Sequence, residues 1–252
     1  SLAIVGRTGS GKTTIINLIN RMYQHQEGRV LIDGIPIEKY SLRYLRTRVG
    51  VVLQDVFLFS DTIANNISLN DPQITMDRIV AAAKAVGADD FISRLPNGYH
   101  YNVMERGSML SVGQRQLISF IRAYVYNPRI LVLDEPTSAL DPVAAEEVLG
   151  ILQRLVHDLG ITVIIAEHRL ERVIGYVDSI IEIGEDGTVK IGKPEEILKN
   201  SKVAPPLVKL ARSLDLPDIP LSVREMRKHT EEIRNSSKDS EKKPRQFGGD
   251  RK

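Results

Sequence analysis

The 252-residue chain contains no cysteine, which excludes disulfide bonds and thiolate metal sites and fits a reducing compartment. It also lacks a long apolar run: none approaches the roughly 18 residues that a helix needs to cross a bilayer. The net charge is only +2, so we expect no strongly anionic partner and no nucleic acid. What is present, 42% hydrophobic and 26% charged residues, is typical of a globular protein with one or two domains.

A glycine-rich segment carries the most specific pattern of the chain. Residues 6–13 read GRTGSGKT, which matches the G-x-x-x-x-G-K-[ST] phosphate-binding loop, or P-loop. The apolar run at residues 2–5 predicts a buried strand before the loop, and apolar residues at helical spacing predict a helix after it. The alternative is a chance match in a glycine-rich loop, which would have no reason to lie between a strand and a helix. We therefore expect backbone N–H groups here to bind phosphate.

Two side chains of the P-loop have expected roles of their own. Lys12 would reach the β- and γ-phosphates of a nucleotide, and the Thr13 hydroxyl would bind Mg²⁺. The expected nucleotide-binding residues of the loop are Gly6, Thr8, Gly9, Ser10, Gly11, Lys12, Thr13 and Thr14.

Two carboxylates follow another apolar run. Residues 130–133 read ILVL and lead into Asp134 and Glu135. In P-loop ATPases an acid at such a strand end contacts Mg²⁺, and the next carboxylate can accept a proton from water or orient it. The alternative is a pair of solvated acids, which the four apolar residues before them disfavour.

Polar side chains follow two further predicted strands. Gln54 ends the apolar run 49–53, and His168 follows the run 161–166. Ligands of open α/β sheets bind at the carboxyl ends of the strands. Gln54 is therefore a candidate ligand of a metal or of attacking water, and His168 can hydrogen-bond a γ-phosphate or a water. Each residue alone is more often an ordinary polar residue at a strand end.

A capping pattern opens a later helix. Residues 110–116 read LSVGQRQ, and Ser111 followed three residues later by Gln114 predicts a capping box. The start of this helix, which includes the small residue Gly113, can equally be a second anion site. These residues alone do not decide between the two interpretations.

Three regions differ in their patterning. Residues 60–125 predict helices without strands, which indicates a helical subdomain inserted between two strands of a domain that covers residues 1–221. From 222 to 252 apolar residues nearly vanish, which predicts a charged helix at most and then a disordered tail. Because the first predicted strand would lie in the middle of a parallel sheet, we also expect further sequence upstream of Ser1.

Taken in order, these motifs resemble the nucleotide-binding domain of ABC transporters over roughly residues 1–200. The segments that carry the resemblance are residues 6–13, Gln54, residues 110–114, 134–135 and 138–141, and His168. The resemblance implies an α/β fold: a P-loop NTPase core with a RecA-like, mostly parallel sheet flanked by helices and an inserted ABC α-helical subdomain. The N-terminal antiparallel β part would be truncated. ATP and Mg²⁺ would bind in a head-to-tail dimer, between the P-loop of one subunit and the signature helix of the other.

The resemblance also implies a role for each motif. The implied metal ligands are Thr13, Gln54 and Asp134. The implied catalytic residues are Lys12, the general base Glu135, and His168, which would hold the γ-phosphate. The implied contacts to the partner's ATP are Ser111, Gly113 and Gln114.

The sequence departs from the family in two respects. The family usually has glycine at the position of Val112; because Ser111 and Gly113 are kept, we expect function to be retained. The family's adenine-stacking aromatic residue and its antiparallel strands lie upstream of the P-loop strand, outside this chain. We therefore expect adenine binding to depend on that upstream segment.

The two halves of the chain are similar to different branches of the family. Residues 57–63 (FLFSDTI) and 105–107 (ERG) are similar to exporters whose ATPase is fused to membrane helices. Residues 134–136 (DEP) and 167–171 (EHRLE) are similar to importer ATPases of the energy-coupling-factor or cobalt type. We hypothesise a mosaic with a crossover near Glu135.

The leading hypothesis is an ATPase that powers transport of a solute across a membrane. Its implied partners are a second ABC ATPase domain and transmembrane transporter domains, which would hold it at the cytoplasmic face of the cell membrane. A non-transport ABC ATPase acting on DNA or ribosomes is disfavoured, because the chain has no sustained heptads and one ATPase unit. A degenerate, inactive module is disfavoured because Glu135 and His168 are both present. A truncated, binding-only module stays an alternative, because the expected upstream segment is missing from the sequence.

Overall fold

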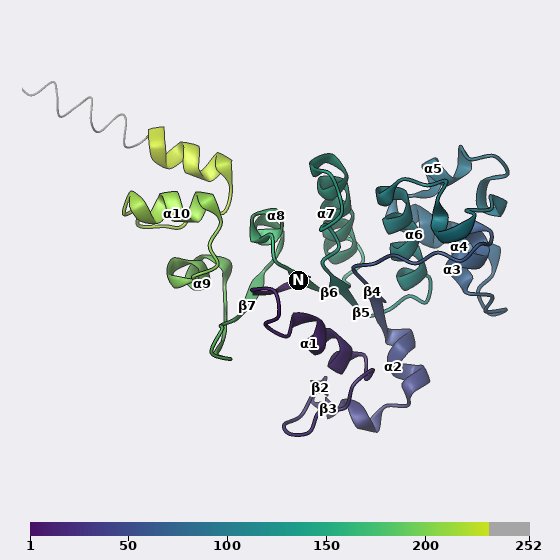
Figure 1. The fold of residues 1–252 in the computed structure, drawn as a ribbon, viewed down its shortest axis with the longest axis horizontal. Coiled ribbons are helices and arrows are strands. Elements are labelled where there is room, and N and C mark those ends of the chain that lie inside the picture. The colour runs from purple at the N-terminus through teal and green to yellow at the C-terminus, as the bar shows by residue number, and fades with distance from the viewer. Residues whose placement is uncertain (232–252) are drawn as a thin grey trace, which may run out of the picture.

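A six-stranded sheet forms the centre of the molecule (Figure 1). The structure is a computed structural model that describes residues 1–231. The strand order is β4-β5-β6-β1-β7-β8, with the first five parallel and β8 antiparallel to β7. The strands are β1 (Leu2–Gly6), β4 (Val49–Val52), β5 (Ile130–Asp134), β6 (Thr162–Glu167), β7 (Ser179–Ile183) and β8 (Val189–Gly192).

Strand β1 is apolar throughout because both faces of the sheet are covered. Successive side chains of a strand point to opposite faces, and Ala3 and Val5 accordingly belong to one core cluster while Ile4 belongs to another. All three are buried. A strand buried on both faces reads as a continuous apolar run. The mostly parallel α/β fold predicted from the sequence is thus confirmed.

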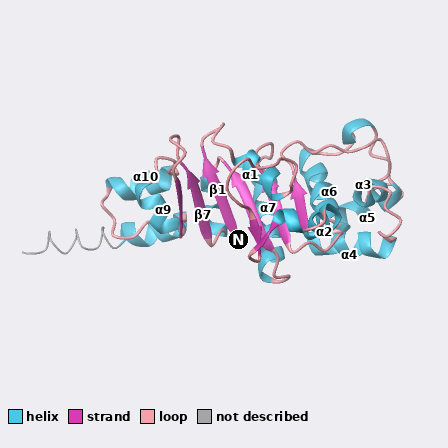
Figure 2. Cartoon of the chain, turned by 90° about the horizontal axis from the view of Figure 1, so that it is seen from below, coloured by secondary structure: helices cyan, strands magenta, loops and turns pink. Residues whose placement is uncertain are grey.

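Helices pack on both faces of the sheet (Figure 2). Helices α1 (Lys12–Ile19) and α2 (Leu42–Arg48) share one cluster with Ile4, through Ile16 and Leu45. Helix α7 (Pro142–His157) packs through Val148 and Leu152 into the cluster on the other face. Between α1 and α2, strands β2 (Leu31–Ile32) and β3 (Ile35–Pro36) form a short antiparallel hairpin.

The chain between β4 and β5 is helical, as the sequence predicts for residues 60–125. Its helices are α3 (Ile63–Ser68), α4 (Met76–Val86), α5 (Asp89–Ser93) and α6 (Val112–Tyr124). They lie together beyond β4 at one end of the molecule (Figure 1). Thr62 and Thr75 accept hydrogen bonds from the backbone N–H groups of the first turns of α3 and α4, which satisfies donors that a helix start leaves unpaired.

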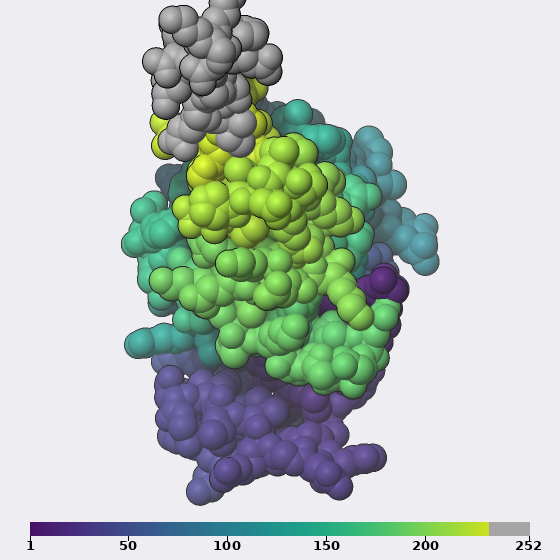
Figure 3. Space-filling view, turned by 90° about the vertical axis from the view of Figure 1, so that its left-hand side faces the viewer, coloured from purple at the N-terminus to yellow at the C-terminus, as the bar shows by residue number. Residues whose placement is uncertain are grey.

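The C-terminal helices cover the other end of the sheet (Figures 2 and 3). Helix α8 (Leu170–Val173) follows β6, and α9 (Pro194–Asn200) and α10 (Pro206–Ser213) follow β8. Arg212 of α10 donates to the carbonyl oxygens of Leu198 and Ser201, and the Ser201 hydroxyl donates to Glu182, which is buried on β7. These bonds tie both helices to the sheet.

Shorter and later segments complete the description. Single 3₁₀ turns occur at Ile37–Lys39, Gly98–His100, Glu105–Gly107 and Ile174–Tyr176. Residues 223–231 are helical, as the charged composition permits; the rest of the predicted tail lies outside the described residues. Among the helices that are described, none has both the length and the apolar character that crossing a bilayer requires.

Candidate active site

The parallel strands bring the predicted site residues to one edge of the sheet. The P-loop follows β1, Asp134 and Glu135 lie at the end of β5, Gln54 comes after β4, and His168 follows β6. These four strands are neighbours in the order β4-β5-β6-β1 and run parallel. Their carboxyl ends therefore meet at the edge where open α/β sheets bind ligands.

The P-loop needs its glycines for two different reasons. Gly9 and Gly11 have φ angles of 84° and 94°, in the left-handed region that residues with a Cβ rarely adopt. At Gly6 the limit is space, because a Cβ there would lie 2.5 Å from Ser10 Oγ and 3.0 Å from the Ile183 carbonyl oxygen. The loop can thus turn tightly and present its backbone N–H groups.

The first turn of α1 has the properties of an anion site. Gly11 is the N-cap of α1 and provides no side-chain cap. The first turn of α1 contains no acidic residue. Backbone donors and the positive end of the helix dipole are therefore available to a phosphate. Lys12 is 5% exposed, and its Nζ donates to the carbonyl oxygens of Gly6 at 2.9 Å and Arg7 at 3.1 Å. The ammonium group is held over the loop.

Asp134 has the surroundings of a metal-binding carboxylate. It is 4% exposed, and its Oδ1 is buried without a hydrogen-bond partner. Burial raises the pKa of Asp134, and the Glu135 charge acts in the same direction, while a hydrogen bond from Thr13 and the charge of Lys12 lower it. Mg²⁺ is bound by one or two protein oxygens together with water and phosphate oxygens. Thr13 and Asp134 fit that donor set, although within residues 1–231 no cluster of three acidic or histidine ligands occurs.

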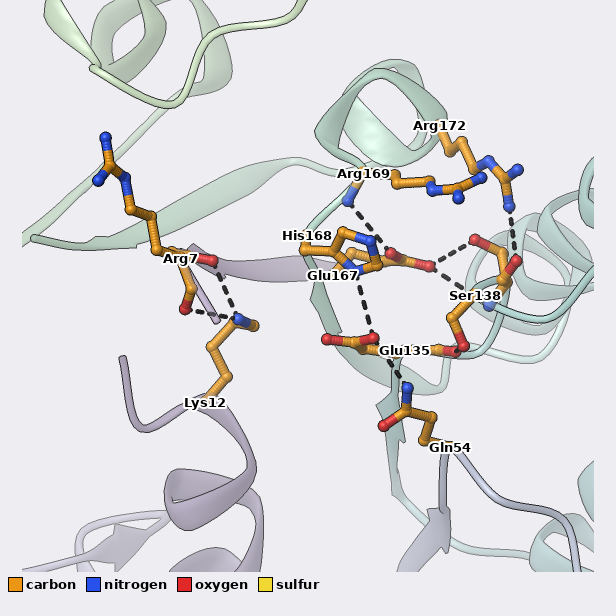
Figure 4. Close-up of polar contacts among 11 residues, drawn as sticks. Arg7, Lys12, Gln54, Glu135, Ser138, Glu167, His168, Arg169 and Arg172 are labelled. Carbon is orange, nitrogen blue, oxygen red and sulfur yellow. Dashed lines mark hydrogen bonds and ion pairs between the residues drawn. The ribbon is translucent and has the colours of Figure 1, made fainter. Parts of the chain in front are cut away.

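Glu135 contacts two other predicted site residues, Gln54 and His168 (Figure 4). Gln54 Nε2 donates to its Oε2 at 3.1 Å, and His168 Nδ1 lies 3.2 Å from the same oxygen. Its backbone has φ 46° and donates to the Ala166 carbonyl oxygen at 2.8 Å. Ser138 donates to the Glu135 carbonyl oxygen through both N–H and hydroxyl. The structure thus places Gln54 beside the expected base.

The predicted signature segment lies in a different part of the chain. Ser111 and Gln114 form the predicted capping box at the start of α6. Gly113 lies against Ala144, with 3.6 Å between Ala144 Cβ and the Cβ that Gly113 lacks, and the segment shares a groove with Asp141. Helix α6 packs on β4, which is three strand spacings from β1, or roughly 14 Å across the sheet. The structure does not bring this segment together with the chain's own P-loop.

Sequence reasoning missed a contact behind Glu135. Glu167, the last residue of β6, is fully buried and accepts hydrogen bonds from the N–H and hydroxyl of Thr137 and from the N–H of Arg169. Arg172 donates to the Thr137 carbonyl oxygen. The signal in the sequence is an acid that ends an otherwise apolar strand, but its partner lies 30 residues earlier.

A sequence model of the family described as ABC transporter matches residues 1–138, more than half of the chain. The chain belongs to the ABC transporter family. The P-loop, Gln54, residues 110–114 and Asp134–Glu135 lie within the matched residues, whereas His168 and residues 139–141 lie beyond them.

Individual relatives of this ABC transporter domain extend the comparison. The ABC transporter ATP-binding protein YknV of Bacillus subtilis (strain 168) is 44% identical over 209 residues, which cover 83% of this chain and 34% of the relative. The toxin RTX-III translocation ATP-binding protein of Actinobacillus pleuropneumoniae is 46% identical over 199 residues, 79% of this chain and 28% of the relative. A bacterial Atm1-family ABC exporter solved with ATP bound has a TM-score of 0.71 at 37% identity, over 80% of this chain and 35% of that one.

Two facts follow from these coverages. The domain spans about a third of the length of the relatives it matches. An alignment of 199 residues in a chain of 252 must extend across Glu135, so a toxin-translocation protein matches residues on both sides of the predicted crossover. The mosaic itself stays a prediction, to be tested by comparing residues 1–130 and 140–220 separately.

Proposed function

We propose that this domain binds ATP with Mg²⁺ and hydrolyses it to power the export of a solute across a membrane. The observation that carries the proposal is the position of Glu135, whose Oε2 contacts both Gln54 and His168 at the sheet edge shared with the P-loop. An acid in that position can accept a proton from a water that attacks a terminal phosphate.

Each side chain of the edge has a task in this proposal. Lys12 transfers its hydrogen bonds from the carbonyl oxygens of the loop to the β- and γ-phosphates. Thr13 and Asp134 would hold Mg²⁺, which neutralises phosphate charge when bound. Gln54 orients the attacking water and His168 the γ-phosphate. Catalysis then consists mainly of positioning and charge stabilisation.

The separation of the two nucleotide-binding segments supports a head-to-tail dimer. Ser111, Gly113 and Gln114 lie on α6, across the sheet from the chain's own P-loop. In a symmetric dimer a surface of each subunit can complete the site of the other. We propose that the signature segment of one subunit closes over the ATP held by the P-loop of the other, whether the two subunits are identical or different.

The relatives support the coupling to transport. They include a toxin-translocation protein and an exporter solved with ATP bound. We propose that transmembrane domains are the partners of this domain and hold it peripherally at the cytoplasmic face of the membrane. Binding of ATP would join two ATPase domains, and hydrolysis would release them.

The test is Mg²⁺-dependent phosphate release from ATP. Glu135→Gln should lower kcat about 100-fold or more, because the amide cannot accept the proton, while ATP binding is retained. Glu195→Gln, on the exposed first turn of α9, is the matched control and should keep wild-type turnover. Unchanged turnover in Glu135→Gln would remove Glu135 from the mechanism.

A further inference from the structure

The buried carboxylate of Glu167 has no role in the proposed mechanism, yet it lies directly behind Glu135. We propose that Glu167 is a positioning residue, which acts through Thr137 to hold Glu135 in the geometry that hydrolysis requires. This inference rests on the proposed ATPase function and assigns to it a residue outside the motifs identified from the sequence.

The first argument is the burial of both partners. Glu167 and Thr137 are each 0% exposed. A carboxylate without solvent is costly unless hydrogen bonds compensate it, and an apolar pair of similar size would often fold as well or better. Glu167 has three donors: the N–H of Thr137 at 3.3 Å, its hydroxyl, and the N–H of Arg169 at 3.4 Å. The three donors thus compensate for the burial of the Glu167 carboxylate.

The second argument is the path from Glu167 to the proposed base. Three consecutive residues at the end of β6 hold three parts of the turn that begins at Glu135. The Ala166 carbonyl oxygen accepts from the Glu135 N–H, Glu167 accepts from Thr137, and His168 contacts the Glu135 carboxylate. Figure 4 shows Glu167 and His168 side by side, above Glu135 in this view.

The third argument is that Thr137 is held from two sides. Glu167 binds its N–H and hydroxyl, and Arg172 donates to its carbonyl oxygen. The turn also contains a residue with a left-handed backbone, since φ of Glu135 is 46°. Such a conformation persists only when the surrounding contacts fix it. Without the Glu167 carboxylate, the turn loses the two bonds from Thr137 that help to fix its position relative to β6.

The experiment is a double-mutant cycle on the full chain, read as kcat and KM for ATP hydrolysis. Glu167→Met and Thr137→Val should each lower kcat about 10-fold or more, since small displacements of a reacting group have effects of that order, and should change KM less than about twofold. Methionine is used because the amide oxygen of a glutamine would still accept from Thr137. The double variant should be no slower than the slower single variant, because both remove one contact. Thr137→Ser keeps the hydroxyl and should restore kcat to within about twofold of the wild type.

Glu182→Met is the matched control. Glu182 is also a buried strand carboxylate with a serine hydroxyl as donor, but it lies on β7, where it anchors the C-terminal helices. The Glu182→Met variant should be less stable than the wild type but should keep its kcat. Equal kcat losses in Glu167→Met and Glu182→Met would overturn the proposal, and so would multiplicative losses in the double variant.

The same series separates this inference from the function on which it rests. Loss of turnover in Glu135→Gln together with wild-type kcat in Glu167→Met and Thr137→Val would overturn the inference alone. Unchanged turnover in Glu135→Gln would overturn both. If Glu167→Met does not fold, as judged by circular dichroism, the two Thr137 variants decide. A loss of kcat in Thr137→Val that is absent in Thr137→Ser supports the inference, and wild-type kcat in both variants overturns it.

Discussion

At the scale of single residues, two adjacent carboxylates have different surroundings. Asp134 is 4% exposed with an unpartnered Oδ1, and burial raises its pKa. The Glu135 side chain is 17% exposed and has Gln54 and His168 as partners. These surroundings support the proposed tasks, a cation contact for Asp134 and proton exchange with water for Glu135. The order of the two acids in the sequence predicts the same tasks, but the difference in their surroundings depends on the fold.

Asp134→Asn should stabilise the nucleotide-free domain while abolishing Mg²⁺-dependent turnover. The folded-state pKa of Asp134 is raised, so its contribution to the free energy of unfolding falls as pH rises through that pKa. Removing the buried charge should add about 1 kcal/mol at neutral pH. The gain should vanish in acid, below the ordinary range of aspartate pKa values, where the wild type is also neutral. Urea unfolding at both pH values measures this, and a less stable variant at neutral pH would contradict it.

At the scale of elements, helix α7 links the site to the groove beside the signature segment. Asp141 Oδ1 accepts from the N–H groups of Val143 and Ala144 at 3.0 Å each, and Pro142 occupies the first helical position. The helix thereby begins at a fixed residue, directly after the turn that starts at Glu135. Its position fixes one wall of that groove.

Asp141→Ala should lower the free energy of unfolding by about 1 kcal/mol, the usual effect of losing an N-cap. Asp158→Ala, at the other end of the same helix, is the control. It should be neutral or slightly stabilising, because a negative charge near a helix C-terminus is unfavourable. Chemical denaturation of the two variants compares them, and equal losses would argue against the capping role.

At the scale of the whole molecule, the proposed head-to-tail dimer requires two half-sites in each chain. The proposed P-loop half belongs to β1 and α1, and the proposed signature half belongs to α6. Two chains in a head-to-tail dimer would form two complete sites, each with one half from either chain. This arrangement makes the activity of a mixture of variants predictable.

Chains with Lys12→Ala and chains with Ser111→Arg should each be nearly inactive alone, and an equimolar mixture should recover activity. Half of randomly paired dimers contain one chain of each kind, and each of these has one intact site, so about a quarter of wild-type turnover per chain is expected. Mixing Lys12→Ala with the double variant, which cannot form an intact site, is the control. A mixture no more active than its components would place both halves of the site within one chain.

The sequence predicted those features that depend on neighbouring residues. The strand, loop and helix around Lys12, the capping box of Ser111 and Gln114, and the polar residues at strand ends are local patterns, and all lie where expected. The contact between Thr137 and Glu167 depends on the register of β5 against β6. Before that register is known, the sequence shows only that Thr137 lies in a predicted turn and that Glu167 follows a predicted strand.

Because the backbone at Glu135 is left-handed, stability and ATP hydrolysis favour different residues at this position. Glycine, which has no Cβ, adopts φ 46° with little strain, so Glu135→Gly should raise the free energy of unfolding by about 1 kcal/mol while eliminating turnover. Thermal unfolding and phosphate release test the two halves of this expectation, and a variant that is both less stable and inactive would contradict the first. A library selected for thermal stability alone would then accumulate glycine at residue 135. Glutamate would persist only in lineages in which hydrolysis is selected.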